Sequence, residues 1–358
     1  MSSVGQAQPR EEYDTEALSR QFRTFAEKVY HGSSALYEQI SRGVSEDPEL
    51  LSLALRARKG ELSPNLFLGA VHFLLLRGIQ HPLSNFYPSL SSSSIREDDP
   101  YPFFRSFCLE NRKEIEDLIS TRRVQTNEVQ RCTCLMPAYS VAYRRAGTPL
   151  SIVDLGASAG LHLLWDHYGY DYGEGKRFGN PGSPVQLTCL LRGNVSPPFP
   201  SSLPIVAYRV GIDVNPIDLN DPEMMLWLKA LVWPEHRKRA ETLNSAIELA
   251  RQTPPTVIPG DVLTVLPEVL SKVPVQTAVC ISHSHLAYQF PKELRERFFS
   301  MLSECGAHRD IFQISYEWWP GKDKPELGLS VFENGAKKEQ LLAYCHPHGE
   351  WLEWVSNE

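Results

Sequence analysis

The sequence predicts an α/β protein in which a doubly wound, mostly parallel sheet follows an all-helical N-terminal region. Two observations predict this class. Apolar residues recur at helical spacing in the first part of the chain, and from residue 150 onward short apolar runs alternate with helical stretches. We therefore expect residues 1–147 to form a helical region that covers the ligand site, and residues 148–358 to form the sheet domain.

The helical region should begin with an amphipathic helix over residues 18–29, where apolar side chains recur at i, i+3 and i+4. Two further helices are expected to begin at Asp47-Pro48 and Ser63-Pro64, because proline is well tolerated in the first turn of a helix. Another helical pattern covers residues 103–122.

The sheet domain is predicted from apolar runs that are separated by helical patterns. The strand candidates are residues 151–155, 207–212, 256–259, 278–282 and 311–315, with 352–355 as a candidate edge strand. The helical patterns lie at residues 223–232, 234–251, 262–273 and 292–305. Residues 168–204 are longer than a simple crossover and rich in Gly, Pro and Tyr, so we expect an inserted hairpin or flap there.

Composition limits the possible partners and compartments. The chain has 358 residues, 42% of them hydrophobic, and a net charge of -7, so it carries no basic excess that would draw it onto nucleic acid or an anionic membrane. Its seven cysteines are scattered, without a disulfide framework or a C-x-x-C zinc pattern, which fits a reducing compartment. No apolar run approaches the roughly 20 residues of a membrane span. We expect a cytoplasmic protein that acts on small molecules; its oligomeric state is not predicted.

A glycine-containing loop follows the first predicted strand. The acid Asp154 precedes Gly156, Ser158 and Gly160 in a D-x-G-x-S-x-G pattern, and the chain then reads as a helix. Such a turn lets the backbone approach a ligand at a helix N-terminus, where unpaired N–H groups favour a carboxylate or phosphate. A tight turn that binds nothing is the alternative.

Two more acids follow the next two strands along the chain. Asp213 ends the second strand and Asp261 follows the third. Because the carboxyl ends of parallel strands meet at one edge of a sheet, these carboxylates are expected beside the glycine loop, where ligands of such sheets bind. Each could instead cap the helix that follows it.

Polar side chains also end the fourth and fifth strands. His283 and His285 are two apart in an extended segment, which predicts that they point to one side, and Glu317 follows the fifth strand. These residues are candidates for a general base or for metal ligands. A polar strand end with histidines bonded to the backbone is the alternative.

Several segments together carry a resemblance to a known family. They are residues 125–131, 156–161, 168–173 with Asp166, 211–216, 227–228, 233–234, and His283, Ser284 and Tyr288. Over nearly its full length the chain resembles an uncharacterised domain-of-unknown-function family, whose core looks like a class I S-adenosylmethionine-dependent methyltransferase. The loop at 154–160 is similar to motif I of those enzymes. His162 stands where the family usually has asparagine.

The resemblance implies a Rossmann-like methyltransferase sheet and a set of site residues. Asp154, Gly156, Ser158 and Gly160 would cradle S-adenosylmethionine, with Asp213 on the ribose and Asp261 beside the adenine. A second set is expected at the amino acid end of the cofactor or at the substrate; it comprises Asn127, Glu128, Arg131 and Tyr288. The alternative for Arg131 and Glu128 is a surface pair at helical spacing.

These observations predict a methyltransferase that acts on a small molecule at N, O or C, with His283, His285 or Glu317 as base. The N/D-P-P-Y signature is missing, so methylation of nucleobase amino groups is not expected. Two alternatives stay open. One is a metal-dependent enzyme using His283, His285 and Glu317, to which Cys345-His346-Pro347-His348 offers further imidazoles. The other is a cofactor-binding relative without catalysis, since Ser158 replaces the usual glycine.

Overall fold

The computed structural model describes residues 15–357 except 59, 62, 91–95, 97, 126 and 335. The chain divides into two compact units. The first comprises residues 1–126 and 226–237, and the second comprises residues 127–225 and 238–358. Neither unit is therefore one continuous stretch of chain.

The first unit is helical within its described residues. Its elements are α1 (Thr15–Phe25), the π turn η1 (Ala26–Tyr30), α2 (Ala35–Glu46), α3 (Pro48–Ala54), α4 (Ser63–Leu76), the 3₁₀ turn η2 (Pro82–Phe86), α5 (Tyr101–Glu110), α6 (Arg112–Thr121) and the end of α8 (Pro222–Ala230). The predicted start at Asp47-Pro48 is confirmed, because the Asp47 carboxylate accepts hydrogen bonds from the N–H groups of Glu49 and Leu50.

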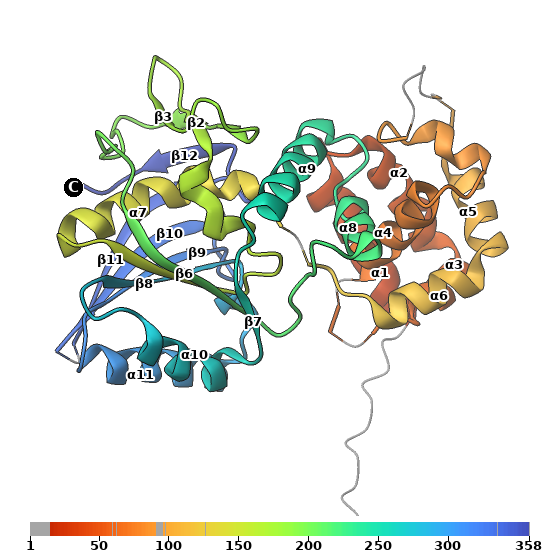
Figure 1. Ribbon diagram of the computed structural model, residues 1–358. Coiled ribbons are helices and arrows are strands. Elements are labelled where there is room, and N and C mark those ends of the chain that lie inside the picture. The colour runs from red at the N-terminus through yellow and green to blue at the C-terminus, as the bar shows by residue number, and fades with distance from the viewer. Residues whose placement is uncertain are drawn as a thin grey trace, which may run out of the picture. The chain divides into compact units, whose positions relative to one another are not determined.

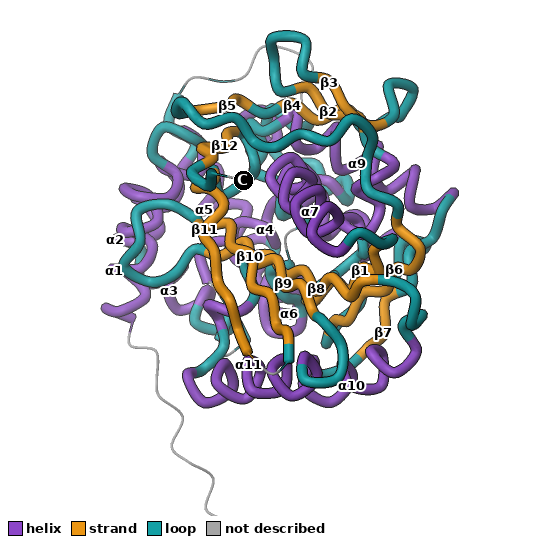
Figure 2. The backbone as a smooth tube through the Cα atoms, turned by 90° about the vertical axis from the view of Figure 1, so that its left-hand side faces the viewer, coloured by secondary structure: helices purple, strands orange, loops and turns teal. Residues whose placement is uncertain are grey.

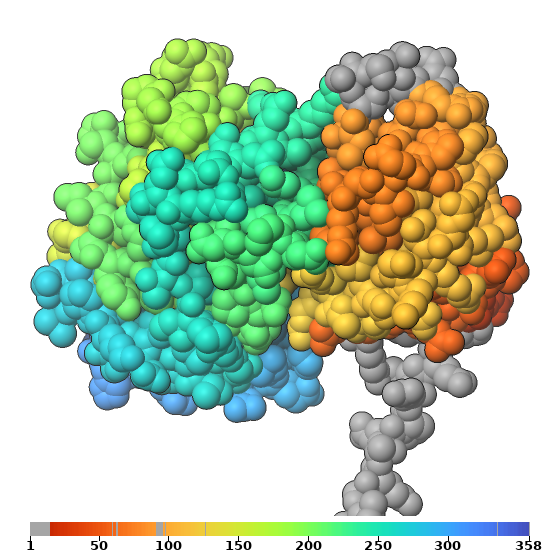
Figure 3. All heavy atoms as spheres, turned by 45° about the vertical axis from the view of Figure 1, so that its right-hand side comes forward, coloured from red at the N-terminus to blue at the C-terminus, as the bar shows by residue number. Residues whose placement is uncertain are grey.

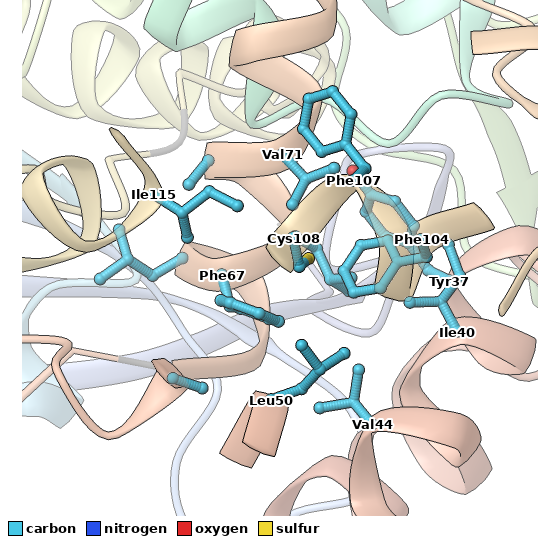
Figure 4. Packing of buried hydrophobic residues seen from close by; sticks show 14 of the residues in the cluster. Tyr37, Ile40, Val44, Leu50, Phe67, Val71, Phe104, Phe107, Cys108 and Ile115 are labelled. Carbon is cyan, nitrogen blue, oxygen red and sulfur yellow. The ribbon is translucent and has the colours of Figure 1, made fainter. Parts of the chain in front are cut away.

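The core of the first unit is aromatic and aliphatic, and it includes side chains from the second of its two chain segments. Phe67 and Phe104 meet edge to face at a centroid distance of 5.8 Å (Figure 4). Trp227 packs against Phe73, and its indole N–H donates to the carbonyl of Arg123 at 2.8 Å. The buried His72 bonds the carbonyl of Ala230 at 2.9 Å. Residues 226–237 are thus part of this core.

The second unit contains a nine-stranded sheet with the order β5-β12-β11-β10-β9-β8-β1-β6-β7 (Figure 2). The strands are β1 (Leu150–Leu155), β5 (Leu190–Arg192), β6 (Val206–Asp213), β7 (Val257–Pro259), β8 (Ala278–Ser284), β9 (Ile311–Glu317), β10 (Glu326–Glu333), β11 (Ala336–Cys345) and β12 (Trp351–Trp354). The five predicted parallel strands are confirmed as β1, β6, β7, β8 and β9. The candidate at 352–355 corresponds to β12, but β5 lies outside it at the edge.

Helices lie on both faces of this sheet. Figure 1 shows α7 (Cys132–Ala146) over one face and α10 (Val262–Lys272) and α11 (Lys292–Gly306) over the other, while α9 (Arg237–Gln252) connects β6 to β7 with α8. All six residues of β1 are buried, as expected for a strand covered on both faces. The structure is a mixed α/β fold with a large, mostly parallel sheet.

The inserted segment after β1 contains a hairpin, as predicted. β2 (Gly169–Asp171) pairs antiparallel with β3 (Arg177–Gly179) and parallel with β4 (Gln186–Thr188). Tyr172 packs against Phe199 and donates its hydroxyl hydrogen to the carbonyl of Thr133, at 2.6 Å. The hairpin lies at the surface of the second unit (Figure 3).

Three features differ from the predicted organisation. The division between units falls after residue 126 rather than at 147, because α7 packs on the sheet and belongs to the second unit. The strands β10 and β11 were not predicted. The helix predicted after the glycine loop is a short 3₁₀ helix, η4 (Leu161–His167), and the chain enters β2 two residues later at Gly169.

Candidate functional site

The site is built at one edge of the sheet, where strands of common direction end. β1, β6, β7, β8 and β9 are parallel, so their carboxyl ends meet there. β11 runs the same way, since it is antiparallel to β10 and β10 is antiparallel to β9. Counted along the chain, the five parallel strands have the order 3-2-1-4-5, and the order reverses between β1 and β8. Ligands of open α/β sheets bind at such a point of reversal.

The loop after β1 has three residues in the left-handed region of backbone conformation. Gly156 has a φ of 70°, Ser158 of 51° and Gly160 of 72°. A Cβ at Gly160 would lie 2.7 Å from Pro255, so no larger residue fits there without movement. Ser158 adopts this conformation although its side chain makes it energetically unfavourable. Residues in such conformations are found most often at functional sites.

Side chains from two other segments hold this loop in place. The Ser158 N–H donates to Asp213 Oδ2 at 2.8 Å, and the Asn215 N–H donates to Asp213 Oδ1 at 2.7 Å. The Asn127 amide donates to Ser158 Oγ at 2.9 Å and accepts from the Ala159 N–H at 3.1 Å. The structure therefore brings together the predicted residues Asn127, Ser158 and Asp213.

The other two strand-end acids have different surroundings. Asp154 is buried, its Oδ1 accepts from Ser282 Oγ at 2.8 Å, and burial raises its pKa although His162 and Ser282 oppose the shift. Asp261 is exposed and caps α10, with its carboxylate accepting from the Leu263 N–H at 3.0 Å. The capping interpretation of Asp261 is thus confirmed, and its contact with an adenine stays a prediction.

Because η4 has only seven residues and 3₁₀ geometry, the predicted contribution of an α-helix N-terminus at Gly156–Gly160 is wrong. The loop itself still presents its left-handed residues at the sheet edge. Whatever the loop binds must be held by its backbone N–H groups and by the side chains around it.

His283 and Glu317 form a buried pair. His283 Nδ1 lies 2.5 Å from Glu317 Oε1, and the side chains are 1% and 0% exposed. Glu317 also accepts from the backbone N–H groups of Leu286, Ala287 and Tyr288 at 3.1 to 3.3 Å. This carboxylate therefore fixes the chain that follows β8. To act as a base, as predicted, His283 or Glu317 would have to be reached by a ligand, although both side chains are fully buried.

His285 occupies a different environment from His283. Its φ of 55° ends the extended conformation of β8, and its ring packs against Tyr288 and Tyr316 at centroid distances of 5.9 and 5.5 Å. Its Nε2 is buried without a hydrogen-bond partner in the described part of the chain. Burial, followed by the charge of Arg131, lowers its pKa to about 2, so the ring is neutral.

A cluster of charged and imidazole side chains lies beside His285. It consists of Glu128, Arg131, His162, Arg239 and His348. Glu128 Oε2 lies 2.6 Å from Arg239 Nη2 and 3.4 Å from His348 Nδ1, while the Glu128 carbonyl bonds His162 Nε2 at 2.9 Å. Burial alone would raise the pKa of Glu128, but Arg239, His348 and Arg131 outweigh it and lower the pKa to about 2.

Arg131 completes this cluster, and its burial rules out the alternative that Arg131 and Glu128 form a surface pair. Both Glu128 and Arg131 are buried, at 5% and 8% exposure, so they are not a surface pair. Arg131 donates from Nε to the Pro347 carbonyl at 2.9 Å and from Nη1 to Ser284 Oγ at 3.2 Å. The loop after β11 thus contributes to the site. The sequence suggested His346 and His348 of this loop only as metal ligands, and it did not suggest Arg239 on α9.

The structure gives no support to a shared metal site. His283 and His285 contact different side chains, and the described residues contain no group of three or more His, Cys, Asp or Glu arranged to hold a metal ion. What the arrangement offers is an ordered loop, buried carboxylates, the neutral imidazoles of His285 and His348 and two guanidinium groups, all at the carboxyl edge of one sheet.

Fold and site together define an α/β protein whose large, mostly parallel sheet carries a cluster of polar side chains at its carboxyl edge. The chain belongs to DUF2332, a family of uncharacterized proteins conserved in bacteria, whose profile matches residues 19–354. The match includes both compact units and the loop after β11. No curated protein and no solved structure matches the chain. Among its described residues, no helix is both long enough and apolar enough to cross a membrane.

Proposed function

We propose that the protein is an S-adenosylmethionine-dependent methyltransferase with a Rossmann-like core that acts on a small molecule. The observation that carries this proposal is the left-handed loop after β1, which the Asp213 carboxylate and the Asn127 amide tie to the ends of neighbouring segments. An ordered loop of this kind at the point where strand order reverses is suited to a nucleoside ligand.

The surroundings of Asp213 fit the ribose end of such a ligand. Each of its oxygens accepts one backbone N–H, and a carboxylate oxygen has a second acceptor position that a hydroxyl group can use. The next residue, Val214, is 62% exposed and offers an apolar surface for a flat ring. Asp261, which follows the adjacent strand β7, would then receive an exocyclic amino group.

His285 is the best placed of the predicted bases. Its Nε2 has no partner among the described residues, whereas the Nδ1 of His283 is bonded to Glu317 and its Nε2 lies 2.8 Å from Gln313. In this proposal, Nε2 of His285 contacts the methyl acceptor, and the pair His283 and Glu317 positions the chain that carries it. Because the pKa of His285 is lowered to about 2, the ring orients the acceptor rather than holding its proton.

We further propose a cytoplasmic location and a small-molecule acceptor. All seven cysteines are free thiols, which suits a reducing compartment. The net charge of -7 argues against a nucleic acid substrate. The metal-dependent alternative has no observation in its favour, and a non-catalytic relative differs from the proposal only in lacking turnover.

Calorimetric titration with S-adenosylmethionine and S-adenosylhomocysteine tests the proposal. Wild-type protein should bind both, and Asp213→Ala should weaken binding by roughly 1.5–3 kcal/mol, the scale of a hydrogen bond to a charged group. Asp218→Ala is the matched control, because Asp218 lies in the same loop, is exposed, and its carboxylate accepts from the Asn220 N–H. Absence of binding by the wild type, or equal loss in both variants, would contradict it.

A further inference from the structure

Arg131 is a buried guanidinium whose hydrogen bonds go to neutral oxygens. It is 8% exposed, and its described partners are the Pro347 carbonyl and the Ser284 hydroxyl, with no carboxylate in ion-pair contact. A guanidinium keeps its charge in proteins and has five N–H groups, so two bonds leave donors for another partner. Burial of a charge without an opposite charge is costly unless a ligand supplies one.

The neighbouring charges do not compensate Arg131. The single carboxylate of the cluster, Glu128, is paired with Arg239 at 2.6 Å. The imidazoles of His285 and His348 have pKa values lowered to about 2 and about 4, in both cases first by burial, so they are neutral near pH 7. Among these five side chains, two positive charges face one negative charge.

Arg131 and His285 lie against the same aromatic ring. The Arg131 Cζ is 6.0 Å from the centroid of the Tyr316 ring, and the His285 ring is 5.5 Å from it. Arg131 also bonds Ser284, the residue before His285. The unpartnered Nε2 of His285 and the unused donors of Arg131 thus belong to one small region after β8.

We propose that Arg131 and His285 bind a carboxylate group of a small-molecule ligand. The planar guanidinium matches a carboxylate, and a neutral imidazole protonated at Nε2 donates the further hydrogen bond. This inference rests on the proposed function only for the source of the group, which is either the amino acid end of the cofactor or the methyl acceptor.

Matched charged and neutral probes test the binding itself. Acetate and benzoate are titrated against acetamide and benzamide at constant ionic strength, with ligand-observed NMR as the readout. Wild-type protein should prefer each carboxylate to its amide by at least tenfold. Arg131→Lys should abolish most of this preference, since a lysine cannot present the planar pair of donors.

Two further variants separate this effect from damage to the fold. Arg209→Lys is the control, because Arg209 is held bidentately by Asp166 elsewhere in the second unit and should leave the preference unchanged. His285→Asn should reduce the preference severalfold and still fold, since asparagine tolerates a φ of 55°. Failure of the wild type to prefer carboxylates, or an equal effect of Arg131→Lys and Arg209→Lys, would overturn the proposal.

Saturating S-adenosylhomocysteine distinguishes the two sources. Displacement of benzoate assigns the site to the carboxylate of the cofactor, and simultaneous binding assigns it to the acceptor; either result supports a carboxylate site. If S-adenosylhomocysteine does not bind at all, the proposed function fails, whereas the comparison of carboxylates with amides still decides the role of Arg131.

Discussion

Replacing Glu128 by glutamine should destabilise the second unit substantially, because this buried carboxylate balances Arg239 and contributes to the field around Arg131. Its pKa is lowered from 4.5 to about 2. At about 1.36 kcal/mol per pKa unit, the charged form contributes about 3 kcal/mol to the free energy of unfolding near pH 7. A lowered folded-state pKa means that this contribution is present above pH 4.5 and is lost as the pH falls toward 2. By the same relation it is about 1 kcal/mol at pH 3.

Hydrogen exchange under increasing denaturant, read on peptides from β1, measures this free energy for the second unit alone. Glu128→Gln should cost about 3 kcal/mol at pH 7, and the difference from the wild type should shrink by more than half at pH 3. Glu268→Gln is the control, because Glu268 makes an exposed pair with Lys272 and its loss should leave stability unchanged within error. Equal effects of the two substitutions, or a Glu128→Gln effect that grows in acid, would refute the reasoning.

Two further predictions concern other parts of the chain. His72 is buried and bonded to Ser89, with a pKa lowered to about 4, first by burial, so its contribution is present above pH 6.5 and lost toward pH 4. Denaturant unfolding should show that the free energy of unfolding of the wild type falls by about 2 kcal/mol more between pH 7.5 and pH 5.0 than that of His72→Gln. An equal fall in both proteins would contradict this. Gly160→Ala should lower the melting temperature more than Gly175→Ala. Both glycines have a positive φ, but an added Cβ would lie 2.7 Å from Pro255 at Gly160 and would meet no atom within 4 Å at Gly175. Equal melting temperatures of the two variants would contradict this.

The parallel strands could be predicted because each is a short, apolar run that is covered on both faces and bounded by polar residues. The strands β10 and β11 were missed for the opposite reason. β11 carries Lys337, Lys338 and Glu339 at exposed positions, so it does not read as an apolar run. In β10 buried and less buried residues alternate as far as Leu329, but Ser330 is buried as well, so the alternation shifts by one residue there. Pairing with neighbours, rather than local composition, makes these two segments strands.

The candidate site was predictable where residues lie at the carboxyl ends of strands. Asp154 and Asp213 belong to that group, because strand direction alone places them at the same edge. Arg239 could not be found in this way, since it comes from a helix and reaches Glu128 only through the folded arrangement. The position of His285 away from His283 depends on a left-handed backbone that the strand pattern does not reveal.

The way the chain is divided has a consequence for its synthesis on the ribosome. The core of the first unit contains Trp227 and Ala230, and Glu235 accepts hydrogen bonds from Ser34 and from the N–H of Leu36 at the start of α2. These residues emerge only after β1 and β6 have been translated. A nascent or truncated chain that ends at residue 126 would therefore expose an incomplete apolar core, and expression of the first unit alone should require residues 226–237 supplied as a fused or separate segment.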